Sequence, residues 1–318
     1  MADNVCAPIV AFVYNRPDKA GAMLESLAAN EQAGDSELFI YSDGAKNDKA
    51  KEGVEETRRY VDSIKEKKLF RNVTIIKSEK NKGLAVSVIE GVTDIINRYG
   101  RVIVVEDDLL LSKHFLTYMN KCLDFYETDR RIWSISGYTP DLYAADTYDK
   151  SVYLNYRGSS WGWATWRDRW EMVDWSVGDY DRFRFDPVAN IRFCFGGNDL
   201  PSMLRAQMKG HIDSWAVRWC YSQSRHNMYS IAPTVSLVSN NGLDGSGTNS
   251  KTEDRLKYGN ISLDGDNTIG NGKKNEWCYE ALQPDRRMLF AFYRKHHLSI
   301  YVRIRDKIRQ LRNKLLPS

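Results

Sequence analysis

Long apolar runs and a cysteine framework are both missing from this sequence of 318 residues. No stretch approaches the ~18 consecutive apolar residues that a membrane-spanning helix needs. The first ten residues lack the basic region and the apolar run of a secretory signal. The five cysteines are odd in number and scattered, without the spacing of a zinc site or a disulfide framework. These absences predict a reduced, cytoplasmic protein.

An excess of charge of one sign is also missing from most of the chain. Lys and Arg number 46 against 42 Asp and Glu, which gives a net charge of +4. From Arg294 onward there are eight basic residues and one acid, Asp306, so the rest of the chain is mildly acidic. This distribution argues against a nucleic-acid-binding protein and indicates that only the basic end contacts something negative.

What the first half of the sequence does contain is an alternation of strands and helices. Five apolar runs predict strands, at residues 8–14, 37–42, 72–77, 101–105 and 132–136. Because these runs are continuously apolar, they predict an α/β protein with a mixed, mainly parallel sheet covered by helices on both faces. From about residue 150 this alternation is lost, and five of the nine tryptophans fall between Trp161 and Trp175.

Polar residues follow three of the predicted strands. Asn15-Arg16, Asp43 and Glu106-Asp107-Asp108 all lie at the carboxyl ends of strands, where α/β sheets bind their ligands. Three adjacent carboxylates after a buried strand repel one another and need a compensating charge. Mn²⁺ or Mg²⁺ prefers such oxygen ligands, so the triplet predicts a metal site, with a solvated acidic turn as the alternative.

The order of these motifs resembles that of the GT-A glycosyltransferases, especially families 2 and 13 and the family of N-acetylglucosaminyltransferase I. The resemblance covers about residues 7–240 and implies a Rossmann-like nucleotide-diphospho-sugar transferase fold. The Asn15-Arg16 turn resembles the first nucleotide loop of those enzymes, and Arg16 suits a phosphate or the face of a base. Ser42-Asp43-Gly44 resembles their uracil-binding acid, with an ordinary Asp-Gly turn as the alternative.

The resemblance extends to the metal and the donor sugar. The run 104–109 resembles the family's DxD motif, which implies that Asp108 binds the metal while Glu106 and Asp107 hold the ribose and the surroundings of the ion. Lys82, in the loop before the next helix, is a further nucleotide-binding candidate or part of a helix-entry turn. The loop 157–163 resembles the glycine–tryptophan loop near the donor sugar, which makes Trp161, Gly162 and Trp163 candidates, with core packing of the two tryptophans as the alternative. We expect Trp166, Trp170 and Trp175 to pack in the core.

An inverting transferase also needs a general base, placed across the sugar from the leaving diphosphate. The segment 211–215 resembles an acid-acid-tryptophan motif of the family, although Ser214 stands where the second acid belongs. Asp213 is therefore our candidate base, with Asp199 and Asp244 as candidates if the register differs. The structural alternative for Asp213 is the N-cap of a helix that contains Trp215, Val217 and Trp219.

The C-terminal tail has a pattern of its own. Leu298, Tyr301, Ile304, Ile308, Leu311 and Leu315 recur every three or four residues, and basic residues fill the positions between them. This pattern predicts a basic amphipathic helix on an anionic membrane face, with packing on the body of the protein or in a dimer as the alternative. The adjacent His296 and His297 are expected on a solvated surface. A glycine-rich segment, 240–249, predicts a loop that orders over the diphosphate, with an ordinary surface loop as the alternative.

These features predict residues 1–150 as a nucleotide-sugar-binding half, 151–285 as an acceptor-binding half and 286–318 as the tail. The function indicated is a metal-dependent inverting glycosyltransferase that uses a UDP-sugar, with N-acetylglucosamine or another hexose as the sugar. Its acceptor is expected to be a glycan on a polyprenyl lipid carrier, in bacterial surface polysaccharide synthesis on the inner face of the cell membrane.

Two other functions stay open at this point. A sugar-phosphate nucleotidyltransferase shares the architecture but needs a glycine-rich loop after the first strand, where this chain has Tyr14-Asn15-Arg16-Pro17. A non-catalytic glycan-binding protein would use the tryptophans but has no need of three acids at a strand end.

Overall fold

The computed structural model describes residues 6–242, 263 and 280–297. In chain order, the elements of its first part are β1 Ile9–Val13, α1 Pro17–Ala28, β2 Glu37–Ser42, α2 Asp48–Glu66, β3 Asn72–Lys77, α3 Leu84–Tyr99, β4 Arg101–Glu106, β5 Leu109–Leu111, α4 Phe115–Tyr126 and β6 Ile132–Ser136. The five strands predicted from the sequence are all present, as are the helices between them.

The second part has shorter and less regular elements. They are the 3₁₀ turn η1 Ala145–Thr147, β7 Val152–Asn155, β8 Trp163–Trp166, α5 Arg167–Trp170, α6 Tyr180–Phe183, α7 Pro187–Cys194, α8 Leu200–Met208, α9 Trp215–Arg225, β9 Tyr229–Pro233, β10 Val238–Asn240 and α11 Arg286–Lys295. The sequence had not predicted the strands β7, β8 and β9, which extend the sheet begun by the first part.

These strands form one eight-stranded sheet in the order β3-β2-β1-β4-β8-β6-β9-β7. Neighbours among β3, β2, β1 and β4 run parallel, as do β6 and β9. Strand β8 is antiparallel to both of its neighbours, and β7 is antiparallel to β9. The sheet is therefore mixed and mainly parallel, as predicted.

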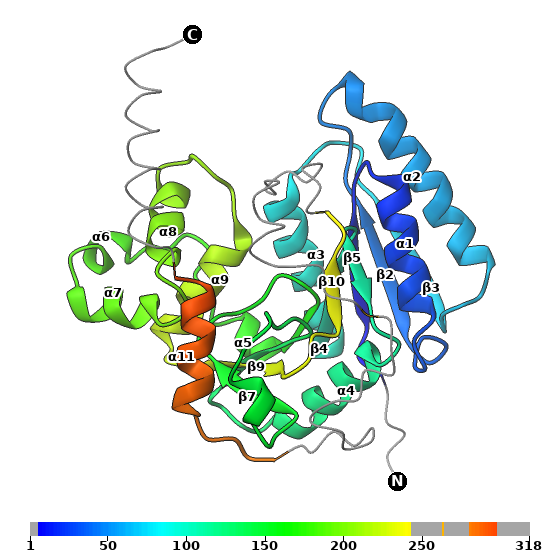
Figure 1. The fold of residues 1–318 in the computed structure, drawn as a ribbon. Helices are drawn as coiled ribbons and strands as arrows, with labels where there is room; N and C mark the ends of the chain where they lie inside the picture. Colours follow the sequence, from blue (N-terminus) through cyan, green and yellow to red (C-terminus); the bar gives the residue numbers. More distant parts are fainter. Residues whose placement is uncertain (1–5, 243–262, 264–279, 298–318) are drawn as a thin grey trace.

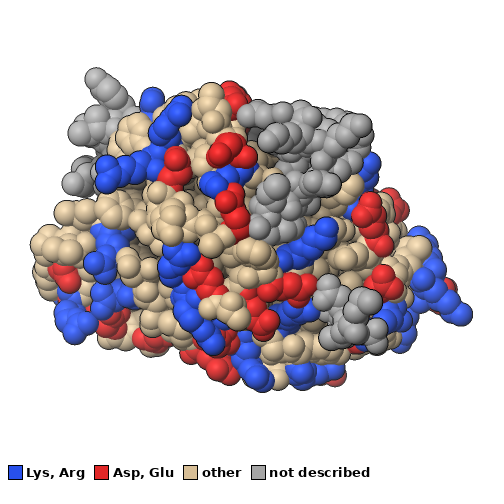
Figure 2. Space-filling view, turned by 90° about the horizontal axis from the view of Figure 1, so that it is seen from below, with Lys and Arg blue, Asp and Glu red and all other residues tan. Residues whose placement is uncertain are grey.

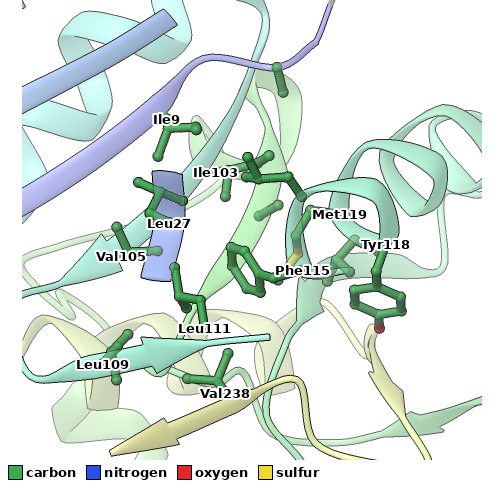
Figure 3. Packing of buried hydrophobic residues seen from close by; sticks show 14 of the residues in the cluster. Ile9, Leu27, Ile103, Val105, Leu109, Leu111, Phe115, Tyr118, Met119 and Val238 are labelled. Atoms are coloured by element: carbon green, nitrogen blue, oxygen red, sulfur yellow. The ribbon is translucent and has the colours of Figure 1, made fainter. Parts of the chain in front are cut away.

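Helices cover both faces of the sheet (Figure 1). Helices α1, α2 and α4 bury their apolar sides on one face, and α3, α5 and α9 pack on the other. Figure 3 shows part of the first core, where side chains of β1, β4, α1 and α4 gather with Leu111 of β5 and Val238 of β10. This three-layer arrangement, a mixed and mainly parallel sheet with helices on both faces, is the α/β architecture that the sequence predicted.

Two smaller clusters complete the described molecule. Helices α6 to α9 enclose a core of their own, which includes Phe183, Phe193, Leu204 and Tyr221. Helix α11 packs on β7 through Met288 and Phe292. Among the described residues, none of the helices is both long and apolar enough to cross a membrane. On the face drawn in Figure 2, basic and acidic side chains are interspersed.

Candidate functional site

The carboxyl ends of β1, β2 and β4 meet at one edge of the sheet. The parallel registers place Val13 of β1 beside Ser42 of β2, and Phe12 beside Glu106 of β4. The polar residues that follow these strands therefore line one cleft of about 860 Å³. Residues from both parts of the chain line this cleft. They include Asn15, Arg16, Asp43, Glu106, Asp107, Asp108, Arg157, Trp161, Asp213 and His296.

Arg16 bonds two of the three acids in the triplet. Its Nη2 donates hydrogen bonds to a carboxylate oxygen of Asp107 and to Oδ2 of Asp108, the latter at 3.2 Å. The backbone N–H of Tyr14 donates to the other oxygen of Asp107 at 3.3 Å. Arg16 immediately precedes Pro17, the first residue of α1, so the start of this helix fixes the place of the guanidinium.

Burial and mutual repulsion shift the ionisation of these groups. Burial raises the pKa of Glu106 well above its ordinary value, and the carboxylates of Asp108 and Asp107 add to the effect. Burial also raises the pKa of Asp107, although the neighbouring Arg16 opposes that shift. Burial alone lowers the pKa of Arg16, but Asp107 and Asp108 outweigh it and the net pKa is raised. One guanidinium thus provides part of the charge that compensates the three acids.

The residues of this cleft fit a divalent cation only in part. Within residues 6–242, 263 and 280–297, no three His, Cys, Asp or Glu side chains come together as a preformed metal site. Asp108 lines the cleft, and Oε1 of the buried Glu106 has no hydrogen-bond partner. A Mg²⁺-type ion needs only one or two protein carboxylates when substrate phosphates supply further oxygens. The donor set therefore fits an ion that binds together with a diphosphate.

Asp43 organises the loop opposite the acids. Its Oδ1 accepts from the backbone N–H of Gly44 at 2.8 Å and of Lys82 at 2.9 Å. Its Oδ2 accepts from Gly83 at 2.9 Å and from the side-chain amide of Asn81 at 3.0 Å. A carboxylate has about four lone-pair sites. Because protein donors fill them here, a nucleobase N–H can reach Asp43 only by replacing one of these donors.

The remaining nucleotide candidates differ in where their side chains go. Asn15 lines the cleft, and its backbone carbonyl lies against Gly53 of α2, where an added Cβ would come within 2.7 Å. The side chain of Lys82 instead forms an ion pair with Glu90 at 2.6 Å and is absent from the cleft lining. Only the backbone N–H of Lys82 takes part in the site, through Asp43.

The two tryptophans beside Gly162 have different environments. Trp161 lines the cleft, with its ring centroid 4.5 Å from that of Tyr138 in an edge-to-face contact. Trp163 is fully buried and stacks on Trp215 with ring centroids 5.1 Å apart. The prediction that Trp163 binds the donor is therefore wrong, because residues 163–166 form the central strand β8 and its side chain points into the core.

The backbone conformation of Gly162 allows Trp161 to face the cleft while Trp163 enters the core. Its φ is +60°, a conformation that glycine adopts readily, and an added Cβ would lie 2.9 Å from both Phe115 and Val238. The predicted core residues Trp166 and Trp170 are buried, and the partly buried Trp175 packs against the same core as Trp170.

The candidate bases differ in their exposure and in their hydrogen-bond partners. Asp213 lines the cleft with a side chain that is 60% exposed, and Nη2 of Arg218 donates to its Oδ1 at 3.1 Å. The N-cap of α9 is Ser214, whose hydroxyl accepts from Val217, so Asp213 does not cap the helix. Asp199 is buried and bound by both terminal nitrogens of Arg157. Asp244 lies outside the described residues, as do most of the glycine-rich segment and the tail beyond residue 297.

The structure also brings in residues that the sequence did not single out. Arg157 and His296 line the cleft, and His296 is buried rather than on a solvated surface as expected. Its spacing of four from Phe292 and eight from Met288, both buried, is the signal that could have placed it on the inner side of α11. Arg58 of α2 donates to the carbonyl of Ser78 at 2.6 Å and ties the ends of β2 and β3 beneath the loop.

Comparisons with known proteins give partial likenesses only. No family model matches the sequence, and no curated protein matches it. The structure of S. aureus TarS overlaps with 38% of this chain and 20% of its own, at 16% identity and a TM-score of 0.29. The structure of UDP-glucose pyrophosphorylase complexed with UDP-glucose overlaps with 52% of this chain and 78% of its own, at 10% identity and a TM-score of 0.30.

These overlaps are shallow, and the matched part of this chain spans only a fifth of the length of TarS. They assign neither a family nor a substrate.

Proposed function

We propose that this protein is a metal-dependent inverting glycosyltransferase that moves a sugar from a UDP-sugar to a hydroxyl group of a glycan acceptor. The observation that carries the proposal is the cleft itself. Asp107 and Asp108 meet the guanidinium of Arg16 at the carboxyl end of the parallel strands, and Asp213 lines the same cleft from α9's side. A charged donor site and an exposed carboxylate are thus joined in one cavity.

The donor half of the cleft suits a nucleoside diphosphate. Arg16 can donate to phosphate oxygens, since its Nη1 is buried without a hydrogen-bond partner. Asn15 and the loop held by Asp43 line the part of the cleft that we assign to the nucleoside, with UDP as the donor nucleotide. A Mn²⁺ or Mg²⁺ ion held by Asp108 would neutralise charge on the leaving diphosphate. Trp161 presents a ring to the donor sugar.

Asp213 is proposed as the general base. Arg218 bonds one of its oxygens and so orients the carboxylate, whose side chain stays accessible from the cleft. In the reaction, Asp213 takes the proton of the acceptor hydroxyl while that oxygen forms a bond to the anomeric carbon. The bond from this carbon to the diphosphate breaks at the same time, which inverts the anomeric configuration and releases UDP.

The cellular setting is part of the proposal. We place the protein in the cytoplasm at the inner face of the membrane of a bacterial cell, where the acceptor is a glycan on a polyprenyl carrier. Support comes from the basic amphipathic pattern of the sequence from Leu298 onward. The five cysteines, whose spacing does not fit a disulfide framework, are a second support. The sugar itself, N-acetylglucosamine or another hexose, depends on the shape of the part of the cleft that holds the donor sugar.

The two rival functions fit the structure less well. A nucleotidyltransferase needs a glycine-rich phosphate loop after its first strand, and the turn that follows β1 contains no glycine. A glycan-binding protein would use the tryptophans, but Trp163, Trp166 and Trp170 are buried in the core, and it has no need of the acids at the end of β4.

A donor screen tests the proposal. The purified protein is incubated with UDP-, GDP- and dTDP-sugars in Mn²⁺ or in EDTA, and release of nucleoside diphosphate is followed. We expect slow, metal-dependent release of UDP from one donor, and its loss in Asp108→Ala. In parallel mixtures with added pyrophosphate, formation of a nucleoside triphosphate and a sugar phosphate would instead establish the nucleotidyltransferase. Formation of a product with retained anomeric configuration would contradict inversion.

A further inference from the structure

Helix α7 carries a stripe of large apolar side chains on its outer side. Phe185, Val188, Ile191 and Phe195 are 75%, 66%, 60% and 47% exposed. They recur every three or four residues, so they follow one side of the helix and of the turns that flank it. The opposite side of α7 is already buried, because Ala189 and Phe193 belong to the core of the small helical cluster.

This stripe exceeds what stability of the fold requires. Single exposed apolar residues are common on protein surfaces, but several large ones side by side mark an interaction surface. Helix α7 needs no outer contact to form, since Asp186 caps its N-terminus by accepting from Ala189 at 2.9 Å and Pro187 begins its first turn. The exposed side chains are therefore available for a partner.

The charge around the stripe is positive. Arg182, Arg184 and Arg192 are exposed beside it, and the guanidinium of Arg184 lies 4.6 Å from the centre of the Phe185 ring. Two acids lie nearby: the carboxylate of Asp186 is engaged as the helix cap, and the exposed Asp181 forms an ion pair with Arg184 at 3.2 Å, so three arginines stand against two acids. Apolar side chains bordered by arginines match the chemistry of an anionic bilayer, with an acyl region beneath negative headgroups.

The position of α7 links the stripe to the cleft. Helix α8 packs against α7 and contributes Leu200, Ser202 and Met203 to the cleft lining. Beyond the C-terminal end of α7, an added Cβ at Gly197 would lie 2.8 Å from the Cβ of His296. The basic tail sequence thus starts beside the end of α7.

We propose that the outer side of α7, formed by Phe185, Val188 and Ile191 with Arg184 and Arg192, docks on an anionic lipid bilayer. Docking through α7 places the α8 side of the cleft next to the membrane. A lipid-linked acceptor is then within reach, and this purpose of the surface rests on the proposed function. The docking itself needs neither donor nor acceptor, so its test is independent of that function.

The test measures binding of the full chain to vesicles by co-sedimentation. Vesicles of phosphatidylcholine alone are compared with vesicles that also contain phosphatidylglycerol. We expect the parent protein to bind the anionic vesicles. The triple variant Phe185→Ser, Val188→Ser, Ile191→Ser is expected to bind them at least about tenfold less tightly, because the apolar contact is lost. Arg192→Gln is expected to weaken binding about fivefold, and only on anionic vesicles.

Leu69→Ser is the matched control, since Leu69 is also apolar and 38% exposed but lies between α2 and β3. It is expected to bind like the parent. Equal binding of the triple variant and the parent overturns the proposal, as does failure of the parent to bind anionic vesicles. A parent that is dimeric by sedimentation velocity, together with a monomeric triple variant, overturns it in favour of a contact between copies. Release of UDP is assayed separately, so its absence bears on the proposed function alone.

Discussion

At the scale of single residues, the charge balance of the cleft depends on Arg16. Its guanidinium bonds both Asp107 and Asp108, in a place where a divalent ion would meet the same carboxylates. Two cations beside one carboxylate pair repel each other unless a diphosphate adds negative charge. This arrangement predicts that the metal and the nucleotide bind together rather than one after the other.

Gly242 sets the position of Asp108. A Cβ at residue 242 would lie 2.7 Å from Oδ2 of Asp108, so an alanine there must displace that carboxylate. We predict that Gly242→Ala weakens binding of UDP with Mn²⁺ by about tenfold, the loss of one good charged contact. Gly34→Ala is the control, because nothing lies within 4 Å of its added Cβ. Calorimetry makes the comparison, and equal affinities in the two variants would show that Asp108 does not contact the ligand.

Asp213 is the residue on which the proposed chemistry depends. We predict that Asp213→Asn lowers the rate of sugar transfer by about 10²- to 10⁴-fold and leaves the affinity for UDP within about twofold. Asp181→Asn, on an exposed aspartate of α6, serves as the control for charge. Transfer is followed in single-turnover mixtures. A rate for Asp213→Asn that matches the parent would remove Asp213 from the role of base.

At the scale of elements, β8 decides which tryptophans belong to the fold and which to the site. Residues 163–166 pair with β4 and β6, so alternate side chains of β8 enter the two cores of the sheet. The turn at Gly162 returns Trp161 to the cleft.

A pair of substitutions checks this division. Trp163→Ala is expected to lower the free energy of unfolding by about 3–5 kcal/mol, because a fully buried indole is lost. Trp161→Ala is expected to cost about 1 kcal/mol of stability and to reduce release of UDP from the donor. Urea unfolding and the donor assay are measured on both. The division fails if Trp161→Ala proves the more destabilising change.

Glu37 ties the start of β2 to its neighbours. The hydrogen bond from Tyr99, aided by Arg71 of the turn before β3, holds the pKa of Glu37 below its ordinary value. A lowered carboxyl pKa stabilises the folded state above the unfolded pKa of about 4.3, and this contribution is lost as the pH falls through the folded pKa.

Because the pKa of Glu37 is lowered, replacing this carboxylate is expected to reduce stability in a pH-dependent way. Glu37→Gln lowers the free energy of unfolding by about 1 kcal/mol at neutral pH, and the difference from the parent begins to shrink below the unfolded pKa of about 4.3 and is lost as the pH falls through the lowered folded pKa of Glu37. Thermal unfolding at several pH values measures it, with Glu55→Gln on the exposed side of α2 as the control. A difference that stays constant with pH would show that the carboxylate charge is not involved.

At the scale of the whole molecule, the first half of the fold follows from the sequence because its strands are continuous apolar runs. The apolar run from Val102 to Val105, followed by three acids, predicts from the local pattern alone a strand with an acidic cluster at its end. The second half depends on contacts between distant segments, such as the pairing of β8 with β4. For this reason the sequence predicts that Trp163 lies in a loop. In the structure it pairs with Val104 of β4 on one side and with Ser136 of β6 on the other.

The site shows the same limit. Residues 106–108 and Asn15-Arg16 were found because each follows a strand directly. Lys82 was placed in the cleft by its neighbours in sequence, yet its side chain turns outward to Glu90. His296 reaches the cleft from a helix that is far away in sequence, and no short motif marks it.

The central claim is that this cleft binds a nucleoside diphosphate together with a metal ion at Asp108. Calorimetry of UDP with Mn²⁺ and with EDTA, on the parent and on Asp108→Asn, tests it most directly. We predict binding to the parent in Mn²⁺ that weakens at least about 100-fold in EDTA or in the variant. Binding of equal strength in all four mixtures, or no binding in any of them, would contradict the account.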